Sequence, residues 1–370
     1  MHYGRTTEMV KNAICFFNSN RTWGGGEKWH LDISIRFRDK GYPVCIVTDK
    51  KSELLRRAKK SGIPTHAMRI SRMSILNPVK LLKISCFLKQ ERIDTIIVNL
   101  PSDLKAAGIA AKHAGVKNII YRRGLAKPVK NRFLNRYLFR NIVTKIIVNS
   151  EETKKLFLMQ NDRFIGEEKI RVIYNGIDLK EFDASPTGFS FPREPDEFLL
   201  GSAGRFVKQK AQHVLIEIAS RLKSKKIKFR MMIAGGGKLK KELERAAREL
   251  GVEREVIFPG FVDDMKGFME SIDVFLLPSL WEGFGYAIVE AMACRKPVIA
   301  FNVSSNPEII DDARTGFLIE DMNVEKFLQK IELLIGDEEL RKRLGEEGRK
   351  KIERDFSIDR VVREVEEMIS

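Results

Sequence analysis

The feature that most constrains the fold is an alternation of short β-branched segments with longer amphipathic segments, which runs through both halves of the chain. In the first half the strand-like segments are NAICFFN, PVCIVTD, DTIIVNL, NIIYR and KIIVNS. In the second half they are FLLGSAG, FRMMIAG, EVIFPG, DVFLLPS, PVIAF and GFLI. Segments with helical spacing, such as residues 240–250 and 324–335, lie between them. Strands that alternate with helices predict parallel, doubly wound sheets of an α/β protein.

The length of 370 residues fits two domains of ordinary size. Residues 175–198 are polar and carry prolines and glycines, so the domain junction is expected there. We therefore expect an N-terminal domain over residues 1–176, a C-terminal domain over 177–354, and a terminal helix over about 355–370. No apolar run reaches the length of a membrane span or of a secretory leader, and the four cysteines are scattered. These features favour a cytoplasmic protein.

The net charge of +17 is concentrated in the first half of the chain. Residues 1–180 carry 36 Lys and Arg against 15 Asp and Glu, whereas residues 181–370 carry 31 against 35. No helix-turn-helix, zinc-finger or RNA-recognition motif is present, so nucleic acid is not the expected partner. An anionic membrane surface is the alternative explanation for a strongly basic domain.

The segment of residues 125–145 favours the membrane explanation, because it contains basic and aromatic residues and no acid. Such a segment can lie among lipid headgroups, and the cations expected to do so are Lys130, Arg132, Arg136 and Arg140. The alternative is a helix that packs its apolar side on the first domain and exposes a solvated basic face.

In open α/β sheets, ligands bind beyond the carboxyl ends of the strands. After one predicted strand comes LWEGFG and then the helical segment YAIVEAMAC, so that Glu282 and Glu290 flank a glycine-containing turn. Free amides at the helix start favour a phosphate, and the two separated acids suit sugar hydroxyls on either side of a diphosphate. The alternative is a solvated Glu282 and a Glu290 in a surface ion pair.

Two other loops carry polar or glycine-rich patterns. Arg205 and Lys210 follow the strand FLLGSAG, and such cations can hold a diphosphate and stabilise its charge as a leaving group. In the first domain, Gly25 and Gly26 lie in a glycine run that precedes a helix. Neither G-x-G-x-x-G nor a P-loop is present, which disfavours dinucleotide dehydrogenases and P-loop nucleotidases. No D-x-D motif is present either, so no obligatory metal is expected.

Together these motifs resemble retaining glycosyltransferases of the family-4 type, which have the GT-B fold. PSLWEGFGYAIVEAMACRKPVIA resembles their E-x7-E signature, GRFVKQK their diphosphate clamp, VIYNGIDLKEF their interdomain segment and GGGEKW their N-terminal glycine loop. PGFVDDMKGFMESIDVFLLPS resembles the run that contacts the nucleotide base. The resemblance covers nearly the whole chain. It implies two Rossmann-like doubly wound domains facing across a cleft.

The resemblance also implies roles for individual residues. It assigns catalysis to Arg205, Lys210 and Glu282, with the two cations on the diphosphate and Glu282 on the sugar. It assigns donor binding to Gly25, Gly26, Phe261, Val262, Phe284, Gly285, Tyr286 and Glu290. Many relatives carry a histidine in the neighbourhood of Arg122 and Arg123, so no histidine role is carried over here. Arg123 could hold an acceptor phosphate or carboxylate, and Arg122 and Arg123 are the expected acceptor-binding residues. His30 and His213 are expected to be structural.

The resemblance implies transfer of a sugar from a nucleotide-diphosphate sugar, with retention and without metal or other cofactor. The expected acceptor is an envelope glycan or glycolipid, such as lipopolysaccharide core or a lipid-linked sugar. The enzyme would then act as a peripheral protein on the cytoplasmic face of the inner membrane. Two alternatives remain: a nucleotide-sugar hydrolase, phosphorylase or epimerase of the same fold, and a basic lipid- or nucleic-acid-binding protein whose site has decayed.

Overall fold

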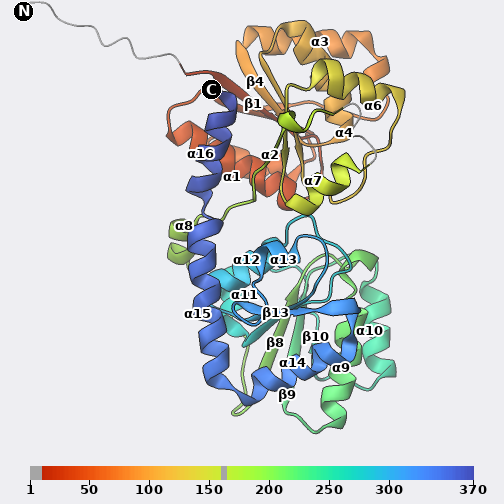
Figure 1. Ribbon diagram of the computed structural model, residues 1–370, viewed down its shortest axis with the longest axis vertical. Coiled ribbons are helices and arrows are strands. Elements are labelled where there is room, and N and C mark those ends of the chain that lie inside the picture. Colours follow the sequence, from red (N-terminus) through yellow and green to blue (C-terminus); the bar gives the residue numbers. More distant parts are fainter. Residues whose placement is uncertain (1–10, 160–164) are drawn as a thin grey trace, which may run out of the picture. The chain divides into compact units, whose positions relative to one another are not determined.

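The computed structural model describes residues 11–159 and 165–370, and it contains two parallel sheets (Figure 1). The first sheet has seven strands in the order β3-β2-β1-β4-β5-β6-β7. Its strands are β1 (Ala13–Phe17), β2 (Val44–Thr48), β3 (Thr65–Ala67), β4 (Ile93–Val98), β5 (Asn118–Arg123), β6 (Lys145–Val148) and β7 (Ile170–Val172). The order reverses at β1, as in a doubly wound fold.

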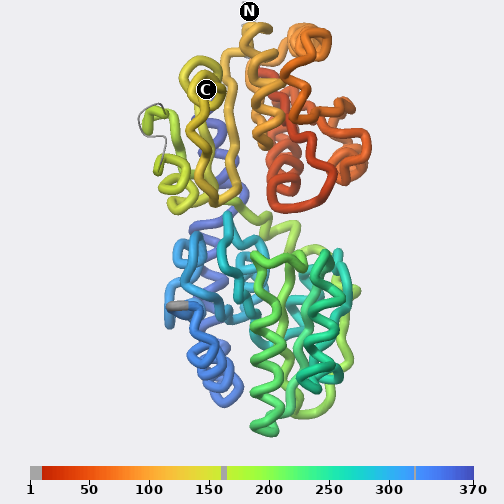
Figure 2. The backbone as a smooth tube through the Cα atoms, turned by 90° about the vertical axis from the view of Figure 1, so that its right-hand side faces the viewer, coloured from red at the N-terminus to blue at the C-terminus, as the bar shows by residue number. Residues whose placement is uncertain are grey.

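The second sheet has six strands in the order β10-β9-β8-β11-β12-β13, and all its pairs are parallel. Its strands are β8 (Phe198–Ala203), β9 (Phe229–Ala234), β10 (Val256–Ile257), β11 (Val274–Leu277), β12 (Val298–Phe301) and β13 (Gly316–Ile319). In Figure 2 the chain of this part passes from green to blue through alternating strands and helices. The order reverses at β8, so the loops after β8 and β11 lie at the switch point where ligands bind in such sheets.

Helices connect the strands on both faces of each sheet. Those before β8 are α1 (Gly25–Asp39), α2 (Glu53–Lys60), η1 (Ser74–Leu76), α3 (Pro78–Gln90), α4 (Pro101–Asp103), η2 (Leu104–Gly108), α5 (Ile109–Ala114), α6 (Phe133–Tyr137), η3 (Leu138–Ile142), α7 (Glu151–Leu158), η4 (Glu167–Lys169) and α8 (Leu179–Ala184). Those after β8 are η5 (Lys208–Lys210), α9 (His213–Ser224), α10 (Lys240–Glu249), α11 (Met265–Ser271), α12 (Tyr286–Ala293), α13 (Asn306–Ile309), η6 (Glu320–Met322), α14 (Val324–Gly336), α15 (Glu338–Asp355) and α16 (Ile358–Ile369).

The chain divides into two compact units. Of the described residues, the first unit contains 11–149, 153–159, 165–173 and 362–370, and the second contains 150–152 and 174–361. The last turns of α16 belong to the first unit, where Glu366 accepts a hydrogen bond of 2.8 Å from the Tyr42 hydroxyl and pairs with Lys40. Glu367 forms an ion pair of 2.5 Å with Arg171 of β7. These contacts attach the end of the chain to two strand regions of the first unit.

Each unit has its own apolar core. In the first unit, α3, α5, η3 and α7 pack on one face of the sheet through side chains such as Leu88, Ala110 and Phe139. Consecutive helices of this layer are in contact with one another, whereas α1 and α2 pair with each other elsewhere on the sheet (Figure 1). In the second unit, α9, α10 and α14 pack on β8, β9 and β12, and α12 packs on β11.

The predicted fold class is confirmed, since both halves form parallel, doubly wound sheets. All eleven segments predicted as strands overlap a strand of the structure. The edge strands β3 and β7 were not predicted, because each has three residues and neither shows a run of apolar residues. Within the described residues, no helix is long and apolar enough to cross a membrane.

Candidate functional site

The carboxyl ends of β8, β9 and β10 are joined by backbone hydrogen bonds in the second unit. The amide of Gly204 donates to Ala234 at 2.9 Å, the amide of Phe206 to Gly236 at 2.8 Å, and the amide of Gly235 to Gly260 at 2.7 Å. The loop that carries Arg205 is therefore fixed by the loop after β9.

Glycine is required at two positions of the loop after β9. Gly235 and Gly237 have φ angles of +135° and +152°, which side-chain-bearing residues rarely adopt. A Cβ on Gly235 would lie 2.0 Å from the carbonyl oxygen of Gly204, and one on Gly237 would lie 2.6 Å from that of Phe206. The two glycines thus allow the close approach of the two loops. Neither glycine was predicted as a site residue, although a run of three glycines directly after a strand is a visible signal.

Lys210 and Glu282 form a largely buried ion pair at this edge of the sheet. The Lys210 Nζ lies 2.5 Å from the Glu282 Oε1, and the two side chains are 15% and 8% exposed. The sequence predicted both residues for one site but did not predict that they touch. Because a buried charged group needs a partner, each side chain holds the other in place.

A second contact holds the two loops of this ion pair together. The Gln209 side chain donates to the Trp281 carbonyl at 2.7 Å, and the Leu280 amide donates to the Gln209 carbonyl at 2.8 Å. Lys210 and Glu282 are thus positioned by neighbouring backbone as well as by each other.

The helix α12 begins directly after the glycine turn. Phe284 is buried against Tyr174, Tyr286 and Phe356, with ring centroids 5.6 to 6.3 Å away. Only its backbone can therefore serve a ligand. Gly285 precedes the helix, and the half-buried Glu290 lies one turn further along it. Glu282 lies in the loop and not on a continuous helix with Glu290.

The remaining predicted residues of the second unit lie on loops after β8 and β10. The Arg205 side chain is exposed, while its carbonyl accepts a hydrogen bond of 3.0 Å from the Gln212 side chain. Phe261 follows β10 and is 68% exposed, and Val262 beside it is half-buried. An exposed aromatic ring next to a sheet edge can stack on a planar ligand.

In the first unit, the glycine loop packs against the end of β4. Gly25 opens α1, and a Cβ on Gly26 would lie 2.7 Å from the Asn99 side-chain nitrogen. The oxygen of the same Asn99 side chain accepts a hydrogen bond of 3.0 Å from Arg122, which is 1% exposed and lies over the Trp29 ring. The structure thus places both Gly26 and Arg122 against the Asn99 side chain.

Two buried carboxylates, which the sequence analysis missed, hold the loop after β1. Glu27 accepts hydrogen bonds of 3.0 and 3.1 Å from the side chains of Asn18 and Asn20. Asp103 accepts hydrogen bonds from the Ser19 amide at 2.9 Å and from the Ser19 hydroxyl at 2.5 Å. Burial raises the pKa of Asp103 to about 7, and the charge of Glu27 raises it too, whereas the Ser19 hydrogen bonds lower it.

Arg123 and His30 are enclosed by protein. Arg123 donates to the Lys127 carbonyl at 2.5 Å and to the Tyr121 hydroxyl at 3.3 Å, and so it supports the loop after β5. His30 is fully buried between Phe16 and Trp29, and burial together with the charge of Arg122 lowers its pKa well below the ordinary value. The exposed His213 opens α9.

The predicted membrane segment has one apolar side in the core and one side exposed. Leu138 and Phe139 pack in the first core, whereas Phe133 is 79% exposed. The four cations predicted to meet lipid are all exposed: Lys130, Arg132, Arg136 and Arg140. Both expected features of this segment, a packed side and an exposed basic side with an aromatic residue, are therefore present.

The carboxyl edge of the second sheet combines a largely buried cation, a buried carboxylate, a helix start and an exposed ring. This combination suits an anionic ligand that also carries hydroxyl groups, since cations and free amides bind phosphate and carboxylates accept from hydroxyls. Among the described residues, no group of three or more His, Cys, Asp and Glu side chains is arranged to hold a metal ion.

Two family models match consecutive parts of the chain. Residues 23–181 match the model described as Glycosyltransferase Family 4, and residues 187–351 match the model described as Glycosyl transferases group 1. The boundary between the two matches falls within the segment predicted as the domain junction.

Individual relatives agree with these models. The chain is 30% identical over 233 residues to the capsular polysaccharide biosynthesis glycosyltransferase CapM of Staphylococcus aureus. This match covers 61% of each of the two chains. The chain is also 24% identical over 315 residues to an Escherichia coli UDP-Gal:alpha-D-GlcNAc-diphosphoundecaprenol alpha-1,3-galactosyltransferase. This second match covers 80% of each of the two chains. The match with CapM thus spans about three fifths of that relative.

A solved structure shows the same fold. The crystal structure of HepE from Anabaena in complex with UDP superposes with a TM-score of 0.81 and 21% identity, and the match covers 96% of this chain and 99% of that one. At this identity the likeness establishes the arrangement of the fold alone.

Proposed function

The chain belongs to the GT-B glycosyltransferases of the family-4 type, and from this premise we propose that it transfers a sugar from a nucleotide-diphosphate sugar to a hydroxyl group of an envelope glycan or glycolipid. The observation that carries the proposal is the buried Lys210–Glu282 pair at the switch point of the second sheet. A protein whose site had decayed would gain nothing from keeping two charges buried there, since replacing such a pair with apolar residues is often neutral or stabilising.

In this proposal the second unit binds the donor. Lys210 and Arg205 contact the diphosphate, Glu282 accepts from sugar hydroxyls, and Glu290 accepts from the ribose. The amides around Phe284, Gly285 and Tyr286 serve the sugar and the phosphate, and Phe261 and Val262 lie beside the base. Support comes from the location of these residues in the segments that follow β8, β10 and β11, with Lys210 in η5 and with Tyr286 and Glu290 in the first turns of α12.

The reaction breaks the bond between the anomeric carbon and the diphosphate oxygen and forms a bond from that carbon to the acceptor oxygen. The acceptor proton passes to the departing phosphate. Negative charge grows on the diphosphate as the bond breaks, and a Lys210 fixed in advance stabilises that charge without reorganising. Attack from the leaving-group side retains the anomeric configuration. No metal or other cofactor is proposed, because cations of the chain itself neutralise the diphosphate.

The first unit is proposed to hold the acceptor, together with donor contacts from Gly25 and Gly26. Arg122, one residue before the end of β5, is 1% exposed and donates to Asn99 beside the glycine loop, so it is proposed to act on the acceptor through Asn99. Arg123 is proposed to act on the acceptor only through the loop that it supports. The names of CapM and of the galactosyltransferase that acts on a diphosphoundecaprenol carrier support an envelope glycan or a lipid-linked sugar as acceptor.

A lipid-linked acceptor requires that the enzyme reach a membrane. We propose a peripheral enzyme on the cytoplasmic face of the inner membrane, with the basic first unit toward the lipid. Residues 1–180 contain 36 Lys and Arg but only 15 Asp and Glu, and this positive charge supports the orientation.

Calorimetry with UDP, GDP and ADP, followed by the sugar conjugates of the nucleotide that binds, tests the donor site. Glu290→Gln should weaken binding of the free nucleoside diphosphate, because its carboxylate is assigned to the ribose. Glu282→Gln should leave that binding nearly unchanged and weaken binding of the sugar conjugate. Equal losses for both ligands in both variants would show that the two roles are wrongly divided. If no nucleotide binds the wild type, the donor assignment is wrong.

A further inference from the structure

The first unit exposes an unusual run of apolar side chains in η1 and α3. Met73, Leu76, Val79 and Leu82 are 57 to 69% exposed and lie within ten consecutive residues. Of the twelve large hydrophobic residues that are exposed in the described part of the chain, these four are the only such group so close in sequence. Concentrated apolar exposure marks a surface that binds something.

The helix α3 has apolar residues on two faces. Ile84 and Leu88, four positions apart, are buried against the sheet. Val79 and Leu82, three positions apart, share another face that is exposed. A helix of a protein that only needed to cover its own core would carry polar residues on this second face.

Along the sequence, the charged residues around these side chains are all positive. No Asp or Glu occurs between Glu53 and Glu91, and residues 54–90 contain nine Lys and Arg. Next to the apolar side chains, Arg69, Arg72 and Lys83 are exposed. A second copy of this chain would bring the same charge to the contact and be repelled, whereas an anionic surface would be attracted.

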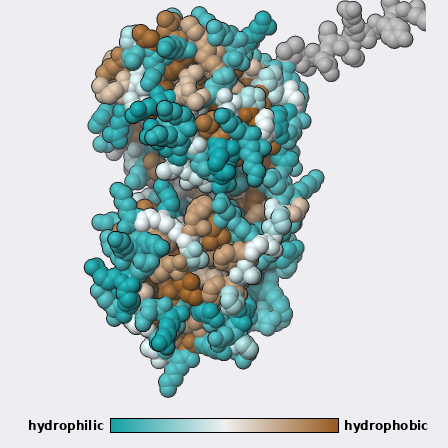
Figure 3. All heavy atoms as spheres, turned by 180° about the vertical axis from the view of Figure 1, so that it is seen from behind, coloured by the Kyte–Doolittle hydropathy of each residue, from teal (hydrophilic) through white to brown (hydrophobic). Residues whose placement is uncertain are grey.

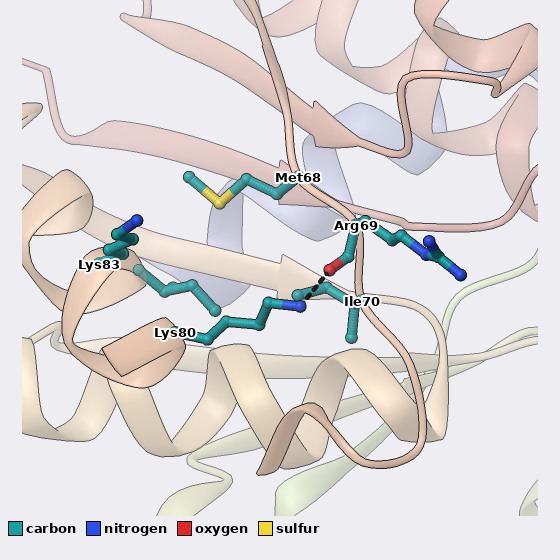
Figure 4. A pocket seen from close by; sticks show the side chains of 6 residues that line it. Met68, Arg69, Ile70, Lys80 and Lys83 are labelled. Atoms are coloured by element: carbon teal, nitrogen blue, oxygen red, sulfur yellow. Dashed lines mark hydrogen bonds between the residues drawn. The ribbon is translucent and has the colours of Figure 1, made fainter. Parts of the chain in front are cut away.

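A pocket opens at the same place, between the segment after β3 and the start of α3 (Figure 4). Its volume is about 170 Å³, and it is lined by Met68, Arg69, Ile70, Lys80, Lys83 and Ile84. The Lys80 ammonium donates to the Arg69 carbonyl at 2.8 Å and lies 3.3 Å from the Ser74 hydroxyl, which keeps the lysine across the pocket. An apolar hollow with cations at its edge suits an amphiphile that has an apolar chain and an anionic head.

The surface belongs to the same helical layer as α6. The α3 helix contacts α5 and η2, η2 contacts η3, and η3 continues α6. In α6 the exposed Phe133 and Tyr137 lie among exposed arginines. Figure 3 shows apolar atoms among hydrophilic ones at the upper end of the first unit, the end at which Figure 1 draws α3.

We propose that the η1–α3 surface, residues 68–84, is the part of the first unit that enters the headgroup region of an anionic bilayer, and that its pocket receives part of one lipid acyl chain. Exposed apolar side chains would insert at the boundary of headgroups and acyl chains, while the surrounding cations pair with anionic headgroups. The proposal deepens the peripheral membrane association proposed above, and it moves the principal contact from the segment of α6 to η1 and α3.

The test is co-sedimentation of the full chain with vesicles of phosphatidylglycerol and phosphatidylcholine, compared with vesicles of phosphatidylcholine alone. The variant Leu76→Ser/Leu82→Ser should lower the partition coefficient on anionic vesicles by about tenfold or more, since each buried CH₂ contributes about 0.8 kcal/mol. The matched control is Leu250→Ser/Leu333→Ser, which removes two leucines of 47% and 41% exposure from the second unit and should bind as the wild type does. Melting curves show whether both variants are folded.

A second measurement does not depend on the strength of binding. With anionic vesicles that contain lipids brominated in the acyl chain, the added fluorescence of Leu82→Trp should be quenched, and that of Leu333→Trp should not be. The absence of quenching in Leu82→Trp, with the protein bound to vesicles, would overturn the proposal.

The other outcomes are also decisive. If Leu76→Ser/Leu82→Ser binds anionic vesicles like the wild type while Arg132→Ala/Arg136→Ala/Arg140→Ala does not, this surface is wrong and membrane association through α6 stands. If the wild type does not distinguish anionic from neutral vesicles, the proposed membrane association itself is wrong.

If light scattering shows a wild-type dimer that Leu76→Ser/Leu82→Ser dissociates, a second copy covers the surface and the proposal is overturned. None of these readouts requires a sugar donor.

Discussion

At the scale of single residues, the Lys210–Glu282 pair has the most direct consequences. We expect Lys210→Ala to lower turnover by about 10²-fold or more, as removal of one group that stabilises a developing charge does. The matched control is Lys208→Ala, which removes an exposed cation from the same short helix η5 and should keep wild-type turnover.

The variant also leaves Glu282 buried without its partner, which costs about 3–5 kcal/mol for such pairs. Turnover should therefore be measured well below the melting temperature of each variant, with circular dichroism to show that the fold is kept. Wild-type turnover in a folded Lys210→Ala protein would contradict the assignment.

Asp103 should make the stability of the protein depend on pH. Its pKa is raised to about 7 in the folded state, mainly by burial, whereas an unfolded aspartate has a pKa of about 3.9. The folded state therefore holds a proton that the unfolded state releases between these values, and stability falls as the pH rises through this window. Asp103→Asn lacks this titration.

The free energy of unfolding of the wild type, minus that of Asp103→Asn, should fall by about 2–3 kcal/mol between pH 5 and pH 8. Urea unfolding at the two pH values measures it, and the subtraction removes the titration of other groups. A difference that is independent of pH would show that Asp103 is ionised throughout.

At the scale of elements, the glycine loop after β9 fixes the loop of Arg205. Gly235→Ala would place a Cβ 2.0 Å from the Gly204 carbonyl oxygen at a φ of +135°. We expect a loss of stability of about 2 kcal/mol or more, together with weaker nucleotide binding, because the two loops must move apart.

Its neighbour provides the control. A Cβ on Gly236 meets nothing within 4 Å, so Gly236→Ala should change stability by less than about 1 kcal/mol. Denaturant unfolding of the two variants, with calorimetry for the nucleotide, makes the comparison. Similar losses in both variants would show that close approach is not the reason for the glycines.

The sequence predicts most of the elements but little of their tertiary contact. Long buried strands such as β4 and β8 have clear patterns, whereas β3 and β7 are short edge strands whose few residues form no pattern. The spacing of Arg205 and Lys210 indicates a shared loop. It does not indicate the 2.5 Å contact between Lys210 and Glu282, which lie 72 positions apart and meet only because β8 and β11 are adjacent.

The apolar residues of η1 and α3 illustrate a different limit. In the sequence, Leu76, Val79 and Leu82 look like core residues of an amphipathic helix. The structure shows instead that Ile84 and Leu88 form the buried face of α3, and that Leu76, Val79 and Leu82 are exposed. Segment 125–145 was the more conspicuous membrane candidate because its cations and aromatic residues alternate without an acid.

At the scale of the whole molecule, the account assigns neutralisation of the diphosphate to the chain's own cations. Activity should therefore survive an excess of EDTA with less than about a twofold change, because no step of the proposed transfer is assigned to a metal ion. Turnover with and without the chelator, at constant ionic strength, measures this. Complete loss of activity that Mg²⁺ or Mn²⁺ restores would contradict it.

The central claim is that the protein moves a sugar to an acceptor and retains its anomeric configuration. Proton NMR of the anomeric region tests it directly, during incubation with UDP-glucose, UDP-galactose, UDP-N-acetylglucosamine or GDP-mannose and lipid-linked or lipopolysaccharide-core acceptors. The account predicts a new glycosidic signal with the donor's anomeric configuration, which requires the acceptor and nearly disappears in Lys210→Ala. Release of free sugar at a rate that the acceptor does not change, or a product of inverted configuration, would contradict it.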